Sequence, residues 1–307
     1  MIGWILPVAT ILLMIYFSLS TNAFLTFDNL FAVANQNSAT FVVAVAMAML
    51  LMSGNIDLSV GSTMALAGVS AGLVFNSAGF WPGLIVGLLV GLVVGLINGV
   101  LIGILGFSAI VVTLGMLASA RGVALTLAPY NVFGFPEGAA ALGTGKIFGI
   151  PYLVIIALLI TLLVMFVMNR LPAGRHIIAI GVNKRAAFLT GIRVNRTVMW
   201  LYVIVGLATG LAAIMQVTRL NSAPSASLGL GFEVTILTAV LLGGIPFEGG
   251  RGSIWRVVLG VWLIGVVKNG LTLLNIGVEI SGIVTGLVLI LAAALETLRR
   301  KVLSSTS

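Results

Sequence analysis

Residues 83–103 read GLIVGLLVGLVVGLINGVLIG, an apolar run without a charged side chain that is long enough to cross a bilayer. Its glycines recur at every fourth position, at Gly83, Gly87, Gly91, Gly95, Gly99 and Gly103. Four residues advance an α-helix by about 400°, so these glycines form a slowly drifting stripe. Small residues let helices approach closely in lipid. We therefore predict a membrane helix buried among others, either packed statically or sliding against a neighbour.

The composition around this run is that of a polytopic membrane protein. The chain has 307 residues, of which 60% are hydrophobic and 7% charged, and its mean hydropathy is +1.26. Soluble domains carry about 25% charged residues. We assign the net charge of +8 to loops beside apolar segments rather than to nucleic-acid binding. The absence of cysteine excludes disulfides, thiolate metal sites and cysteine nucleophiles.

We expect one transmembrane domain, residues 1–307, that is all-α with about ten spans. A span needs about 20 apolar residues. The amino terminus lacks the positive region of a signal peptide, so we interpret it as a retained first helix. The predicted spans are 3–19, 36–53, 58–75, 81–105, 107–128, 150–168, 197–217, 229–245, 253–274 and 279–297.

A basic segment, residues 170–196, reads RLPAGRHIIAIGVNKRAAFLTGIRVNR and contains no acidic residue. Positively charged loops stay in the cytoplasm, and ten spans then place both termini there too. Within the segment, Asn183 is expected to cap a short helix over 184–190 that stops at Gly191. Ala186 and Ala187 give this helix small faces, which favour close docking of a partner.

Two glycine-rich segments interrupt apolar runs. They are residues 50–62 (LLMSGNIDLSVGS) and residues 241–253 (LLGGIPFEGGRGS). Irregular backbone at membrane depth is tolerated where it lines a cavity or is buried in protein. Each segment is therefore either a broken helix or a cytoplasmic turn. Their similarity suggests an internal duplication.

Catalytic and metal-binding patterns are absent from the sequence. The GTGKI run at 143–147 has Ala140 and Ile147 where a phosphate-binding loop needs Gly and Ser or Thr. His176, the only histidine, has no metal-binding context. We predict neither an enzyme nor a metal site.

Polar residues within the apolar segments are candidates for the transport pathway. Ionisable side chains are costly at a helix centre, about 2.5–3.5 kcal/mol each; those at or near spans are Asp57, Arg121, Glu233, Arg256, Lys268 and Glu279. We hypothesise that Lys268 pairs with Glu279. The predicted pathway residues are Asn55, Asp57, Ser59, Asn98, Thr113, Thr235 and Asn269, although such residues can instead join helices by hydrogen bonds.

Four ordered motifs resemble the permeases of ribose-type ABC importers: SGNIDLSVGSTMALAG (53–68), AIGVNKRAAFLTGI (179–192), LLGGIPFEGGRGS (241–253) and NGLTLL (269–274). The resemblance covers nearly the whole chain. It implies a type II, vitamin-B12-importer-like fold in a bacterial inner membrane. It also implies a second permease subunit, identical or related, two cytoplasmic ATPase domains that bind ATP and Mg²⁺, and a periplasmic sugar-binding protein that delivers a sugar or polyol.

The same resemblance makes 170–196 the ATPase-coupling loop. The family pattern falls on Gly181, Asn183, Ala186, Ala187, Gly191 and Ile192, with Lys184 and Arg185 between them. This chain itself is expected to bind no cofactor and no nucleic acid, only lipid, solute and protein partners. Asn55, Arg256 and Lys268 depart from the family pattern, which leaves the substrate open. The rival interpretations are an ion-coupled secondary transporter of a small polar solute, which would rely on Asp57 and Glu233, and a membrane enzyme or structural partner.

Overall fold

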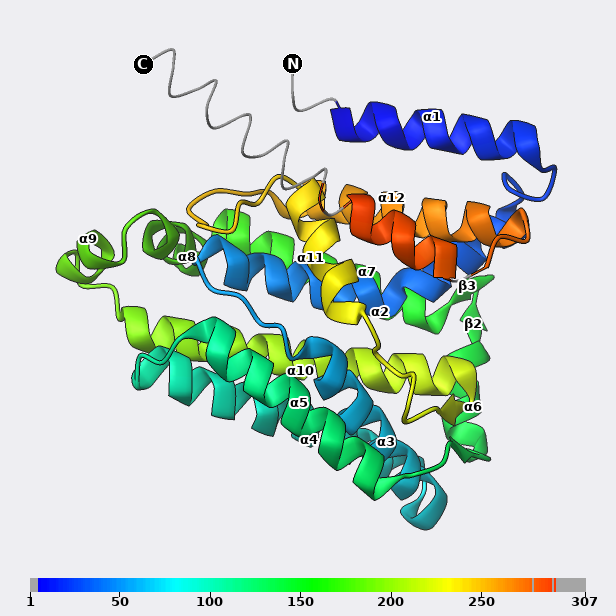
Figure 1. Cartoon of the computed structure of the whole chain (residues 1–307), viewed down its shortest axis with the longest axis horizontal. Helices are drawn as coiled ribbons and strands as arrows, with labels where there is room; N and C mark the ends of the chain where they lie inside the picture. The colour runs from blue at the N-terminus through cyan, green and yellow to red at the C-terminus, as the bar shows by residue number, and fades with distance from the viewer. Residues whose placement is uncertain (1–4, 278, 289, 291–307) are drawn as a thin grey trace.

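The computed structural model of this chain describes residues 5–277, 279–288 and 290 as a bundle of long helices (Figure 1). Among these described residues, seven helices are long and apolar enough to span a membrane, so the chain is a multi-pass membrane protein. They are α2 (Phe27–Met52), α3 (Val60–Ala78), α4 (Phe80–Gly99) with its π-helical extension η2 (Val100–Ile104), α5 (Ala109–Leu127), α7 (Tyr152–Arg170), α10 (Val194–Leu220) and α12 (Ile254–Leu273).

Within the described residues, two of the ten predicted spans are shorter helices. The expected spans 3–19 and 229–245 correspond to α1 (Ile5–Ser20) and α11 (Phe232–Leu242). The expected span 279–297 is described only as a helix over Glu279–Val288, and most of its remaining residues lie outside the described part. The apolar run at 229–245 gave too long a span because its first residues belong to an irregular segment. Conversely, α2 begins nine residues before the predicted 36, because Thr26 caps it by accepting from Asn29 N at 3.3 Å.

The bundle has two distinct ends (Figure 1). One, the α9 end, carries α8 (Pro172–Val182) and α9 (Lys184–Leu189). The other, the α6 end, carries α6 (Glu137–Thr144) and four two-residue strands, β1 (Val132–Phe133), β2 (Lys146–Ile147), β3 (Ile150–Pro151) and β4 (Ser222–Ala223). The strands pair antiparallel as β1–β4 and β2–β3. This end therefore orders much of the stretch between the predicted spans 107–128 and 150–168.

The glycine stripe of α4 packs directly on the backbones of its neighbours. A Cβ added to Gly95 would lie 2.6 Å from Tyr202 O, and one added to Gly99 would lie 2.6 Å from Met199 O. A Cβ at Gly206 of α10 would overlap Gly91 O in return. Such close approach maximises dispersion contact where lipid provides no hydrophobic drive. The glycine face of this helix is therefore buried among its neighbours, as predicted, whereas Ile85, Leu89 and Val93 of the same helix are exposed.

Two irregular segments enter the bundle from opposite ends (Figure 1). Residues 53–59 return from the α9 end to the start of α3, and residues 221–231 return from the α6 end to the start of α11. The two helix starts meet where a Cβ at Gly61 would overlap Gly229 O. Residues 53–59 are buried or half-buried, as membrane-depth backbone requires, whereas 221–231 is partly exposed, with Leu230 68% exposed. The first glycine-rich segment is therefore a broken-helix element rather than a surface turn.

Candidate functional site

The short helix predicted in the basic segment is present as α9. Asn183 Oδ1 accepts from Ala186 N at 3.0 Å, which is the expected N-cap. Gly191 ends the helix with φ of 88°, and Ile192 N donates to Ala187 O at 3.2 Å. Before it lies α8, which the sequence reading missed although Pro172 at its first position is a helix-start signal.

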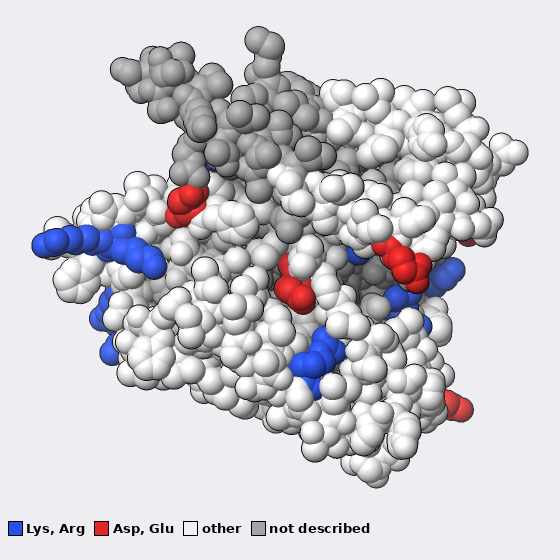
Figure 2. All heavy atoms as spheres, viewed as in Figure 1, with Lys and Arg blue, Asp and Glu red and all other residues white. Residues whose placement is uncertain are grey.

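The two alanines of α9 have different roles in the structure. Ala187 is buried, with 4% of its surface exposed, whereas Ala186 is exposed. The interpretation that both alanines form a docking face is therefore wrong for Ala187, which packs inward on the protein. The large exposed side chains at this tip include Val182, Phe188 and Leu189, together with Lys184 and Arg185. Figure 2 shows Lys and Arg side chains gathered at the same end.

Three of the sequence motifs, those that contain Gly54, Gly181 and Gly250, meet at one backbone junction next to the α8–α9 connection. Gly250 N donates to Met52 O at 2.8 Å, which joins the 243–253 loop to the end of α2. Gly181 of α8 lies against both, since a Cβ there would overlap Met52 O and Gly250 N. Gly54 and Gly249 also meet, and both have positive φ, 74° and 77°. Glycine is required at these positions, because a side chain would keep the three backbone segments apart.

From this junction the 53–59 segment runs into the bundle and is fixed by buried hydrogen bonds. Asp57 Oδ1 accepts from Ser59 N at 2.8 Å and from Ser59 Oγ at 2.6 Å. Asn98 Nδ2 of α4 donates to Ser59 Oγ at 3.0 Å. Tyr202 of α10 donates through its hydroxyl to Ile56 O at 2.8 Å. Three predicted pathway residues thus form one network that attaches the segment to α4, and Tyr202 attaches it to α10.

The other predicted pathway residues are scattered. Thr113 Oγ1 donates to Ala109 O within its own helix. Asn269 of α12 exchanges two hydrogen bonds with Asn29 of α2, at 2.9 and 3.0 Å, and so joins two helices. Thr235 accepts from Lys268 Nζ at 3.2 Å. The predicted Lys268–Glu279 pair is wrong, because the two residues form no ion pair and the Lys268 ammonium lies instead on α11.

A cavity of about 680 Å³ opens beside this network at the α9 end. Asn55 lines it together with Lys184, Asn195, Phe247 and the turn over residues 106–110. Asn55 also donates to Ser53 O at 3.1 Å. The π-helical η2 contributes Ile102 and Gly103 to the wall, and π-helical turns are frequent at functional sites.

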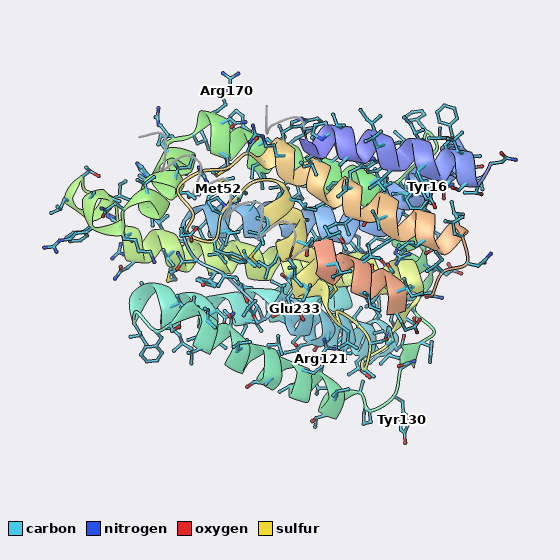
Figure 3. The ribbon with its side chains drawn as sticks, turned by 45° about the horizontal axis from the view of Figure 1, so that its top comes forward. Tyr16, Met52, Arg121, Tyr130, Arg170 and Glu233 are labelled. Carbon is cyan, nitrogen blue, oxygen red and sulfur yellow. The ribbon has the colours of Figure 1, made fainter. Side chains whose placement is uncertain are left out.

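A second polar group lies in the middle of the bundle, where sequence reasoning noted the residues but did not assign them to the site. Arg121 of α5 donates to Leu228 O at 2.7 Å and to Ser225 O at 3.3 Å. Glu233 of α11 lies beside it (Figure 3), and the two charges interact electrostatically. Both residues are half-buried. No metal-binding group of three or more His, Cys, Asp or Glu occurs among the described residues.

Comparison with known proteins places the chain among transport permeases. Residues 29–293 match the family described as "Branched-chain amino acid transport system / permease component". The D-allose transport system permease protein AlsC of Escherichia coli (strain K12) is 35% identical over 299 residues, which cover 96% of this chain and 91% of that protein. The autoinducer 2 import system permease protein LsrD of Yersinia pseudotuberculosis serotype O:1b (strain IP 31758) is 35% identical over 300 residues, covering 94% and 90%. No solved structure matches the chain.

These matches agree with the motif resemblance and with the prediction of a transport subunit rather than an enzyme. The family match covers most of the chain, from α2 into the last described helix. The chain therefore belongs to the family of transport-system permease components.

Proposed function

We propose that this chain is the transmembrane permease of an ATP-driven ABC importer that moves a sugar or polyol delivered by a periplasmic binding protein. It forms one domain, residues 1–307, of the ten-helix type II fold in a bacterial inner membrane, with the α9 end and both termini in the cytoplasm. The observation that carries the proposal is the similarity to D-allose and autoinducer 2 import permeases over nearly the full length. The family description names branched-chain amino acids, so the solute class is the part that most needs a test.

The ATPase partner docks on α9. Val182, Phe188 and Leu189 form the exposed tip. Their exposed fractions are 70%, 69% and 77%. Apolar side chains that project from the end of a membrane bundle into water are typical of a protein-binding surface. The basic residues around the tip favour an acidic rim on the partner. ATP and Mg²⁺ bind to that partner, and α9 passes its movement to the junction at Gly181.

The docking surface is tested with Phe188→Asp in the permease co-expressed with its ATPase. We expect Phe188→Asp to lose ATPase co-purification, because a charge in the apolar contact is left without a partner. Tyr130→Asp is the matched control, since Tyr130 is 86% exposed at the α6 end. Equal ATPase retention by the two variants would contradict docking on α9.

A second permease subunit covers the outward face of α5. Cβ atoms added to Gly115 and Gly122 would meet nothing within 4 Å, and Ser119 between them is exposed. All the α4 glycines, by contrast, have close neighbours. An unfilled small-residue face on a membrane helix favours close packing of another helix. The chain has no cysteine, so any disulfide of Gly115→Cys forms through this position. In a homodimer we expect oxidation to link two Gly115→Cys chains by a disulfide. In a heteromeric pair we expect a disulfide only with a cysteine introduced in the partner.

The importer itself is tested by uptake into proteoliposomes that contain the permease, its ATPase and its binding protein. ATP-dependent accumulation of D-allose or a related sugar or polyol supports the proposal. Accumulation driven by an ion gradient without ATP supports the secondary transporter instead. ATP-dependent uptake of leucine without sugar uptake assigns the chain to amino acids.

A further inference from the structure

The search for a solute contact leads to the point where α3 and α11 begin. Arg121 lies 12 residues after the start of α5 and six before its end, about 18 Å and 9 Å along that helix, so a membrane-spanning α5 holds it inside a hydrocarbon core about 30 Å thick. Glu233 is the second residue of α11. Both side chains are half-exposed on this chain, and a charge facing lipid at that depth is strongly disfavoured.

The carboxylate of Glu233 is held between two helix starts. Its Oε2 lies so close to Gly61 that a Cβ there would overlap it, and Gly61 is the second residue of α3. Glu233 is also in the first turn of α11. Helix N-termini carry partial positive charge, so both helices favour the ionised carboxylate. The two helix starts are therefore already compensated by an internal anion, and an anionic solute is disfavoured there.

Arg121 holds the 221–231 segment and retains free donors. Both of its hydrogen bonds within the described residues come from Nη1, to Ser225 O and Leu228 O. Nε and Nη2 therefore remain available, since a guanidinium has five N–H donors. The hydroxyl of Ser225 is also buried, at 1% exposure, and has no hydrogen-bond partner among the described residues. Arg121 therefore has donors left for a third group.

The pair is neutral overall but rich in hydrogen-bonding groups. Arg121 and Glu233 interact electrostatically without a salt bridge within the described residues, so each can bind a third group. A guanidinium donates and a carboxylate accepts, and a hydroxyl does both. Adjacent hydroxyls can therefore bridge the two side chains. Bonds to charged groups are stronger than bonds between neutral groups.

We infer that Arg121 and Glu233 line a water-filled part of the pathway and contact a neutral, hydroxyl-rich solute as it passes. This inference rests on the proposed importer function and names a solute contact outside the seven pathway residues predicted from the sequence. Arg121 also positions the 221–231 segment, and Glu233 is the freer of the two to bind solute. The test therefore centres on Glu233.

Because the chain has no cysteine, single-cysteine variants report on one position each. Glu233→Cys is compared in the assembled transporter with Leu159→Cys, an exposed position in the middle of α7, and with Tyr130→Cys at the water-exposed α6 end. The probe is a positively charged methanethiosulfonate, which reacts with thiolate in water. A thiol in an apolar setting has a raised pKa and each unit reduces thiolate tenfold, so we expect Glu233→Cys to react at least about tenfold faster than Leu159→Cys.

D-Allose is then added before the reagent, with leucine as the comparison. We expect D-allose, but not leucine, to slow modification of Glu233→Cys, while modification of Tyr130→Cys is unchanged by either. A Glu233→Cys reaction as slow as that of Leu159→Cys overturns the inference, because the position is then dry. Protection by leucine and not by D-allose also overturns it.

Glu233→Gln provides an independent measurement without a reagent, since it keeps the shape and removes the charge. We expect D-allose uptake to fall about tenfold while ATPase co-purification is unchanged, because bonds to a charged acceptor are lost. Unchanged uptake contradicts the inference. Absence of sugar uptake by the unmodified transporter contradicts the proposed function itself, so the two failures are separate.

Discussion

Gly95→Ala in α4 is expected to destabilise the protein although alanine is the better helix former. The added Cβ would lie 2.6 Å from Tyr202 O and 3.1 Å from the Cα atoms of Val203 and Gly206. Ordinary contact begins near 3.4 Å, so α4 and α10 must separate by about 0.8 Å. All three neighbours are backbone atoms and cannot rotate away. Overpacking of this size costs about 1–3 kcal/mol.

The assay is thermal unfolding of the purified chain in detergent, with Gly282→Ala as the matched control. Gly282 lies in the helix Glu279–Val288, and a Cβ there meets nothing within 4 Å. For a chain of this size, 1 kcal/mol corresponds to a change in Tm of about 2–4 °C. We expect Gly95→Ala to lower Tm by about 2–12 °C and Gly282→Ala to leave it unchanged or slightly raised. Equal melting of the two variants would refute the close α4–α10 contact.

The remaining predictions concern the junction, the cap and the membrane charges. Gly181→Ala should separate α8 from Met52 and uncouple the transporter, so that the ATPase still co-purifies and hydrolyses ATP while uptake falls; normal uptake would show that the junction transmits no movement. Asn183→Ala should cost about 1 kcal/mol of α9 stability and weaken ATPase binding about fivefold, measured as Kd, whereas Asn183→Ser should restore it. Exchanging the charges of Lys268 and Glu279 in a double variant should not rescue Lys268→Glu, because Lys268 bonds to α11; full recovery of uptake would reinstate the pair.

Several features could be predicted because they depend on residues close together in the chain. The membrane run at 83–103 and its glycine stripe follow from composition and helical period. The α9 helix follows from Asn183 and Gly191, which act on backbone groups within a few positions. Asp57, Ser59 and Asn98 could be selected from the sequence as polar residues in or beside apolar segments, although only the structure brings them together.

Other features were decided only by tertiary packing. Nothing in KRAAFL tells which alanine faces inward, because that depends on where the rest of the protein lies. Apolar length predicted a span at 229–245, but 221–231 is irregular because it meets the start of α3 at Gly61.

The charges show the same division. The sequence by itself determined which side chains would be costly in a membrane, since that cost belongs to the residue type. Which partner compensates each charge was decided by contacts across the fold. Arg121 reaches carbonyl groups more than a hundred residues away, at Ser225 and Leu228, and Lys268 turns to Thr235 rather than to Glu279. The local sequence determines which side chains need a hydrogen-bond partner in the membrane, and the packing of distant segments determines which groups provide it.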